Sequence, residues 1–96
     1  MSVVVAYDVN TETAAGRRRL RRIATACKDY GQRVQKSVFE CEVGGADWVK
    51  LKHRLLEEMD EKTDSLRFYF LDSDAARKTE HHGLGRPVDL GGPLIA

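Results

Sequence analysis

The sequence predicts an α+β domain in which two helices cover one face of a mainly antiparallel sheet. Two observations predict this class. Runs of β-branched and aromatic residues alternate with segments whose apolar residues recur every three or four positions. Their order along the chain is strand, helix, one or two strands, helix, strand. A chain of 96 residues has room for one such domain. We expect a core at residues 1–72, a connector at 73–86 and a closing strand at 87–96.

The first strand and the first helix are predicted from the opening third of the chain. Residues 3–9, VVVAYDV, form a β-branched run that predicts a strand buried on both faces, with Asp8 at its end. Turn and N-cap residues at positions 10–13 predict a helix from about residue 14 to Tyr30, closed by Gly31.

The first helix divides into an apolar stripe and a basic side. The stripe comprises Leu20, Ile23, Ala24 and Cys27, and the basic side comprises Arg17, Arg18, Arg19, Arg21 and Arg22. Residues 17–36 hold eight Arg or Lys against one acid, although the net charge of the chain is only +1. Such an imbalance suggests a polyanionic partner, of which nucleic acid is the commonest, and the alternative is an ordinary solvated helix face.

The middle of the chain predicts further strands and a second helix. Residues 33–43 alternate between apolar and polar, and periodicity leaves open whether they form one strand or two that break near Lys36-Ser37. Gly44-Gly45 turns the chain, and Asp47 is placed to cap a second helix that ends at Thr63-Asp64. The apolar stripe of that helix comprises Trp48, Leu51, Leu55 and Met59, widened by Val49 and Leu56.

The last third contains one clear strand, a polar segment and an apolar end. Leu66–Leu71 predict a strand, and the polar residues from Asp72 to Pro87 predict a mobile connector that carries His81 and His82. The apolar residues near the end need something to pack on. We therefore interpret residues 87–96 as an added strand lent to a second copy of the protein.

Asp8 is the sharpest candidate for a functional side chain. A carboxylate at the end of a buried strand, just before a helix, lies where functional sites of α/β proteins usually gather. Mg²⁺ commonly takes one or two such carboxylates as ligands. The alternative is that Asp8 only stabilises the turn. The other candidates are weaker. Cys27 and Cys41 are interpreted as unreactive, and the adjacent histidines as solvated loop residues without the spacing of a metal pair.

Several segments, taken together and in order, resemble the Cas-two family, the smaller of the two core CRISPR-associated spacer-acquisition proteins. They are VVVAYDV, the arginine-rich helix, GQRVQKSVFECEV, DSLRFYFL and the closing GRPVDLGGPLIA. The resemblance implies a ferredoxin-like β-α-β-β-α-β fold with a break near Lys36-Ser37. It also implies a homodimer whose C-terminal strand joins the sheet of the partner.

The resemblance further implies a metal-dependent endonuclease acting on RNA or DNA. The catalytic and metal-binding aspartate of the family falls on Asp8, one from each subunit, with Mg²⁺ or Mn²⁺ as the cofactor. Tyr7 and Phe39 fall on site-supporting positions, and Arg33 joins the first-helix arginines as a nucleic-acid-binding residue. Lys36 stands where relatives commonly have an aromatic residue.

Two functions fit these observations. The chain is either a nuclease or a non-catalytic dimeric adaptor that binds duplex DNA and bridges copies of the larger CRISPR integrase during spacer integration. A small-molecule-sensing regulator would leave the basic window unexplained. With no export signal and no apolar run long enough to span a bilayer, we expect a cytoplasmic protein without a membrane partner.

Overall fold

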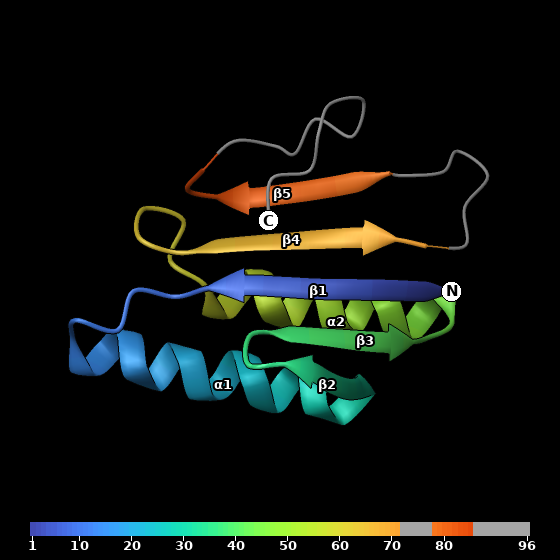
Figure 1. Cartoon of the computed structure of the whole chain (residues 1–96), viewed down its shortest axis with the longest axis horizontal. Helices are drawn as coiled ribbons and strands as arrows, with labels where there is room; N and C mark the ends of the chain where they lie inside the picture. The colour runs from blue at the N-terminus through green and yellow to red at the C-terminus, as the bar shows by residue number, and fades with distance from the viewer. Residues whose placement is uncertain (72–77, 86–96) are drawn as a thin grey trace.

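A five-stranded sheet with two helices on one face makes up the computed structural model, which describes residues 1–71 and 78–85 (Figure 1). The elements are β1 (Ser2–Asp8), α1 (Ala14–Tyr30), β2 (Gly31–Gln35), β3 (Val38–Glu42), α2 (Gly45–Glu58), β4 (Ser65–Phe70) and β5 (Thr79–Gly83). Each neighbouring pair of strands is antiparallel, in the order β2-β3-β1-β4-β5. The α+β class and the break between residues 35 and 38 are confirmed. The proposed exchanged strand at 87–96 lies outside the described residues.

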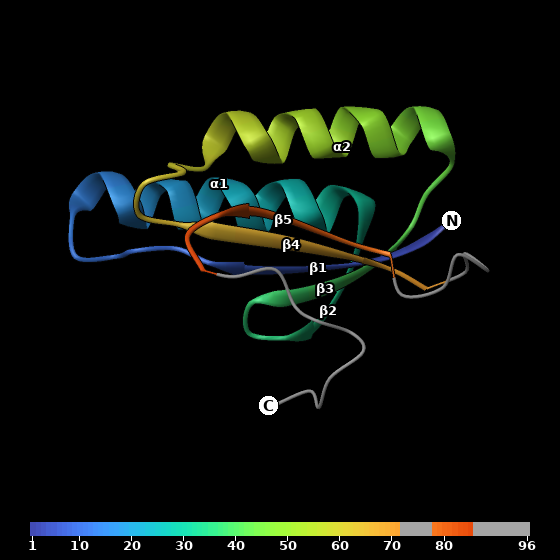
Figure 2. The same ribbon diagram turned by 90° about the horizontal axis from the view of Figure 1, so that it is seen from above.

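The core lies between the sheet and the two helices (Figure 2). Its largest fully buried side chains are Phe39, Phe68, Ile23, Leu51, Leu55 and Leu66. Trp48 of α2 meets the ring of Phe68 edge-on, with the ring centroids 4.9 Å apart. The helices cover one face of the sheet, so the side chains of its other face have no second layer over them within the described chain.

The central strand β1 alternates between these two faces. Val3, Val5 and Tyr7 point into the core and are at most 5% exposed, whereas Val4 and Ala6 are of intermediate burial. The expectation that β1 is buried on both faces is therefore wrong for the single chain. A β-branched run does not distinguish a doubly covered strand from one whose second face lacks a covering layer.

The predicted bounds of α1 are confirmed, and its two ends differ in mechanism. At the start, the Thr13 hydroxyl accepts a hydrogen bond of 3.0 Å from the Gly16 backbone nitrogen. At the end, Gly31 is extended, with φ −159°, and leads directly into β2. A side chain at Gly31 would lie 2.5 Å from the carbonyl oxygen of Glu40. Glycine is thus required by the close approach of β3 rather than by a left-handed backbone.

Both ends of α2 differ from the bounds predicted from the sequence. Gly44 is the N-cap residue without a side-chain hydrogen bond, and Asp47 lies inside the first turn, where its charge favours the helix N-terminus. The helix ends at Glu58, well before Thr63-Asp64. Val49 is 66% exposed and does not widen the apolar stripe.

The expectation of a connector without regular structure is wrong for residues 79–83. They form β5, which pairs with β4 and places His82 opposite Leu66. Their polar sequence did not indicate a strand, because the side chains of this edge strand are only partly buried. Glu80 forms an ion pair of 2.6 Å with Lys52 of α2, and the centre of the His82 ring lies 5.7 Å from that of Phe68. In residues 1–71 and 78–85, neither helix is long and apolar enough to cross a membrane.

Candidate nucleic-acid interface

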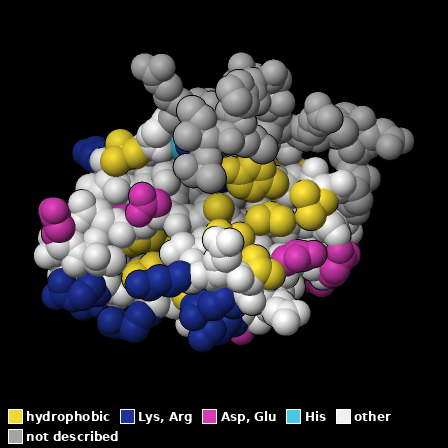
Figure 3. All heavy atoms as spheres, in the orientation of Figure 1, with side chains coloured by type: hydrophobic (Ala, Val, Ile, Leu, Met, Phe, Trp, Pro, Cys, Tyr) yellow, Lys and Arg dark blue, Asp and Glu magenta, His cyan; other side chains and the backbone are white. Residues whose placement is uncertain are grey.

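Basic side chains gather on the outer surface of α1. Four of its arginines are exposed, namely Arg17, Arg18, Arg21 and Arg22. Figure 3 shows Lys and Arg side chains along the edge of the molecule occupied by this helix. Glu58 of α2 approaches Arg22, at 3.7 Å between Nε and Oε1, but most of that guanidinium remains in solvent. Four of the five predicted first-helix arginines are therefore available to phosphate groups.

Arg19 is the exception, and its predicted role as a nucleic-acid ligand needs correction. Its Nε donates to the Asp64 carboxylate at 2.9 Å, and the side chain is only 19% exposed. The position of Arg19 around the helix turns it away from the other arginines toward the loop between α2 and β4. The guanidinium is engaged in holding the fold together.

Asp64 is a buried carboxylate whose importance sequence reasoning missed. It is fully buried, and besides Arg19 it accepts hydrogen bonds from the backbone nitrogens of Asn10 and Asp60 at 3.0 and 2.9 Å and from the Thr63 hydroxyl. Burial raises the pKa of the Asp64 carboxyl, but the bonds from Arg19, Asp60, Asn10 and Thr63 outweigh it, and the pKa lies below its usual value. One carboxylate thereby ties together the β1–α1 loop, α1 and the α2–β4 loop.

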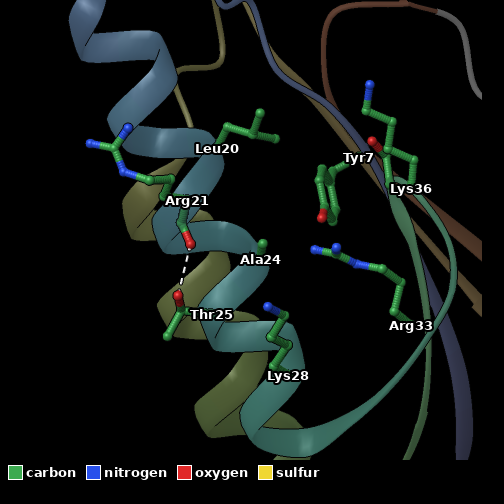
Figure 4. Close-up of a pocket in the computed structure, with 9 residues that line it drawn as sticks. Tyr7, Leu20, Arg21, Ala24, Thr25, Lys28, Arg33 and Lys36 are labelled. Atoms are coloured by element: carbon green, nitrogen blue, oxygen red, sulfur yellow. Dashed lines mark hydrogen bonds between the residues drawn. The ribbon is translucent and has the colours of Figure 1, made fainter.

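A groove opens between α1 and the β2–β3 hairpin (Figure 4). Its volume is about 440 Å³. Its lining residues are Tyr7, Leu20, Arg21, Ala24, Thr25, Lys28, Arg33, Lys36 and Ser37. Lys28 and Lys36 belong to the basic window but were not predicted to bind nucleic acid, because only the fold brings the end of the helix beside the hairpin.

Arg33 is fixed at the hairpin side of this groove. Its guanidinium lies 5.1 Å from the centre of the Phe39 ring and reaches the hydroxyl end of Tyr7 (Figure 4). Tyr7 in turn stacks on Phe39 with the ring centres 6.2 Å apart. Burial and the nearby Cys27 raise the pKa of the Tyr7 hydroxyl, while Arg33 opposes the rise. The structure thus brings Tyr7, Arg33 and Phe39 together, with the two rings orienting the cation.

Asp8 lies on the other side of the sheet. Tyr7 points toward the helices, so its neighbour in the strand faces the open side, where Asp8 is exposed. It borders a shallow hollow that is also lined by Ala6, Tyr7, Ser65, Arg67 and Tyr69. The structure therefore separates Asp8 from the arginines of α1 by the thickness of the sheet.

The oxygen atoms of Asp8 are of the kind that Mg²⁺ prefers. One chain brings a single carboxylate to this place, however, and the described residues contain no group of three or more His, Cys, Asp or Glu side chains that could hold a metal ion. The donor chemistry of Asp8 fits a divalent cation.

The two cysteines are buried and take no part in either surface. Burial raises the pKa of the Cys27 thiol to about 12, and burial together with Glu40 also raises the pKa of Cys41. Both remain protonated at neutral pH, so they are not nucleophiles, as the sequence predicted.

Comparison with known proteins shows the family of this chain. The model of the family described as CRISPR associated protein Cas2 matches residues 1–79. The chain belongs to the Cas2 family. The resemblance of the sequence to this family is thereby confirmed.

Relatives of this Cas2-family chain match it from end to end. The "CRISPR-associated endoribonuclease Cas2" of Chlorobaculum tepidum is 65% identical over 99% of both chains. The "CRISPR-associated endonuclease Cas2" of Halalkalibacterium halodurans is 47% identical over 99% of both chains. The crystal structure of Streptococcus pyogenes Cas2 at pH 6.5 covers 77% of this chain and 89% of its own, with 64% identity and a TM-score of 0.70. These likenesses confirm the ferredoxin-like fold of the Cas2 family.

Proposed function

We propose that this Cas2-family chain works as a homodimer that binds nucleic acid and hydrolyses phosphodiester bonds of RNA or DNA in support of CRISPR spacer integration. The observation that carries the proposal is the cationic surface of α1, on which four arginines face solvent without an acidic residue among them. Guanidinium groups bind phosphates at any physiological pH. The names endoribonuclease and endonuclease, borne by close relatives, supply the reaction class.

The proposed homodimer uses the open face of the sheet. Strand alternation and register place four apolar or aromatic residues on this face: Val4, Ala6, Val38 and Tyr69. Each of them is of intermediate burial in the single chain. Figure 3 shows hydrophobic side chains gathered over the centre of this face. A second copy would cover them. We further propose that residues 87–96 add a strand to the sheet of the partner.

In this dimer Asp8 supplies the metal ligand. It lies at the end of the central strand on the open face, so two copies placed face to face bring two carboxylates toward one another. Close carboxylates repel unless a cation or a proton lies between them. The bound Mg²⁺ or Mn²⁺ would lower the pKa of a water molecule and polarise the phosphate. The arginines of α1 lie beyond the other face of the sheet, where they would bind phosphates elsewhere along the nucleic acid.

The alternative is a non-catalytic adaptor that binds duplex DNA and bridges copies of the larger CRISPR integrase. The separation of the two sites favours it. The arginines of α1 and the side chain of Asp8 lie on opposite faces of the sheet, so binding of nucleic acid does not require Asp8. Such an adaptor keeps the homodimer and the basic helix and loses only the hydrolysis.

Comparison of wild type with Asp8→Asn separates the two functions. With Mg²⁺ or Mn²⁺ we expect the variant to lose cleavage and to bind nucleic acid as wild type does, because the charge that holds the cation is gone and the arginines remain. Chelator should abolish cleavage by wild type. Full cleavage by Asp8→Asn would contradict the assigned site. If neither protein cleaves and both bind, the adaptor function is the correct one.

A further inference from the structure

The groove between α1 and the β2–β3 hairpin combines features that phosphate binding alone does not require. Its floor is apolar and consists of Leu20, Ala24 and the ring of Tyr7 (Figure 4). Its rim is cationic and consists of Arg21, Lys28, Arg33 and Lys36. Its volume of about 440 Å³ lies within the range of small-molecule sites.

The four cations are available to bind an anion from outside the chain. No acidic side chain lines the groove, and within residues 1–71 and 78–85 none of the four forms an ion pair with a carboxylate. The nearby Asp29 is instead paired with Arg54 at 2.7 Å. Arg33 is already oriented by Phe39 and Tyr7, so little side-chain freedom is lost when it binds.

We propose that this groove binds one nucleoside phosphate, with its base against the apolar floor and its phosphate at the cationic rim. The inference rests on the proposed function only for the source of the ligand, which is either a free nucleotide or an unpaired nucleotide of a bound strand. A paired nucleotide keeps its base inside the duplex and meets only the rim. The groove therefore discriminates unpaired from paired nucleic acid, which the outer arginines of α1 do not.

The first test measures affinity by isothermal titration with adenosine 5′-monophosphate, adenosine and inorganic phosphate. We expect the nucleotide to bind at least about tenfold more tightly than either part, because floor and rim both contribute. Lys28→Gln and Lys36→Gln should each weaken nucleotide binding about threefold, as expected for a partly exposed ion pair. Lys50→Gln on the exposed side of α2 removes the same charge elsewhere and should change nothing. Equal affinity for phosphate and nucleotide would overturn the proposal, as would unchanged binding in both groove variants.

A second variant tests the floor and the source of the ligand. Ala24→Leu places a larger side chain in the groove without altering charge, and circular dichroism checks that it folds. It should weaken nucleotide binding at least about tenfold by occupying the space of the base, and wild-type affinity for the nucleotide would overturn the assignment. If the ligand is part of a strand, Ala24→Leu also weakens binding of single-stranded oligothymidylate but not of duplex DNA. If it is a free nucleotide, both nucleic acids bind as before. Duplex binding by a variant such as Arg18→Gln tests the proposed function and not the groove, because Arg18 lies outside the groove lining.

Discussion

At the scale of single residues, Asp64 shows how a functional surface depends on a structural carboxylate. Charged residues are rarely buried unless paired, and nothing in the local sequence marks this aspartate as different from its neighbour Asp60. The partners of Asp64 come from three separate segments, so its role follows from tertiary structure alone. By binding Arg19 it also decides which arginines of α1 remain free for a ligand.

Asp64→Asn should destabilise the protein by about 1.5–3 kcal/mol at pH 7, because hydrogen bonds to a charged group are removed or weakened. The pKa of Asp64 is lowered in the folded state, so its stabilising contribution is present above the unfolded pKa and is lost as pH falls through the folded pKa. Urea unfolding at several pH values, at one protein concentration, should show a flatter acid limb for the variant than for wild type.

A matched control is available in Asp29→Asn. Asp29 forms an exposed pair with Arg54 at 2.7 Å, and such pairs contribute less than about 1 kcal/mol. A loss of stability as large as that of Asp64→Asn would contradict the distinction drawn between the two carboxylates.

At the scale of elements, the sequence predicted helices and strands best where burial is one-sided. The bounds of α1 follow from its apolar stripe and the Thr13 cap, and β4 follows from alternating apolar residues. β5 could not be predicted, because a partly covered edge strand has no such alternation. The groove could not be predicted either, since Lys28 and Lys36 meet across it only after the hairpin folds back along α1.

The outward-facing part of α1 should dominate affinity for duplex nucleic acid. Replacing Arg18 and Arg22 together with Gln should weaken binding similarly for unrelated sequences. It should also flatten the dependence on salt, by up to about one unit of log–log slope for each phosphate that the protein no longer neutralises. Filter binding at several salt concentrations measures both effects. An unchanged slope would place the duplex on another surface.

At the scale of the whole molecule, the sheet separates the cationic surface of α1 from the face that carries Asp8. The helix side carries the cations, and the open side carries Asp8 together with a band of half-buried apolar residues. Both sets of residues were predicted from the sequence, Asp8 as the metal ligand and the arginines as the residues that bind nucleic acid. Only the alternation of β1, with Tyr7 turned toward the helices and Asp8 turned away, reveals that the sheet lies between them.

Val4→Glu should therefore convert the proposed dimer into monomers. Val4 lies on the open face between Glu40 and Tyr69 in the register of the sheet, and a second carboxylate beside Glu40 would be buried in the interface. Val49→Glu introduces the same charge at an exposed position of α2 and should leave the oligomeric state unchanged. Light scattering at equal concentrations compares the two, and a stable dimer of Val4→Glu would contradict use of this face.

The central position of β1 has a consequence for how the chain reaches its native state. β1 precedes the other described strands along the chain, yet both of its neighbours, β3 and β4, come from much later parts of the sequence. Contacts between residues so distant along the chain slow folding, because loop closure precedes the gain from pairing. Until Ser65–Phe70 have left the ribosome, one edge of β1 stays unpaired and prone to association with other chains. Folding of this sheet is thus expected to wait until β4 has emerged.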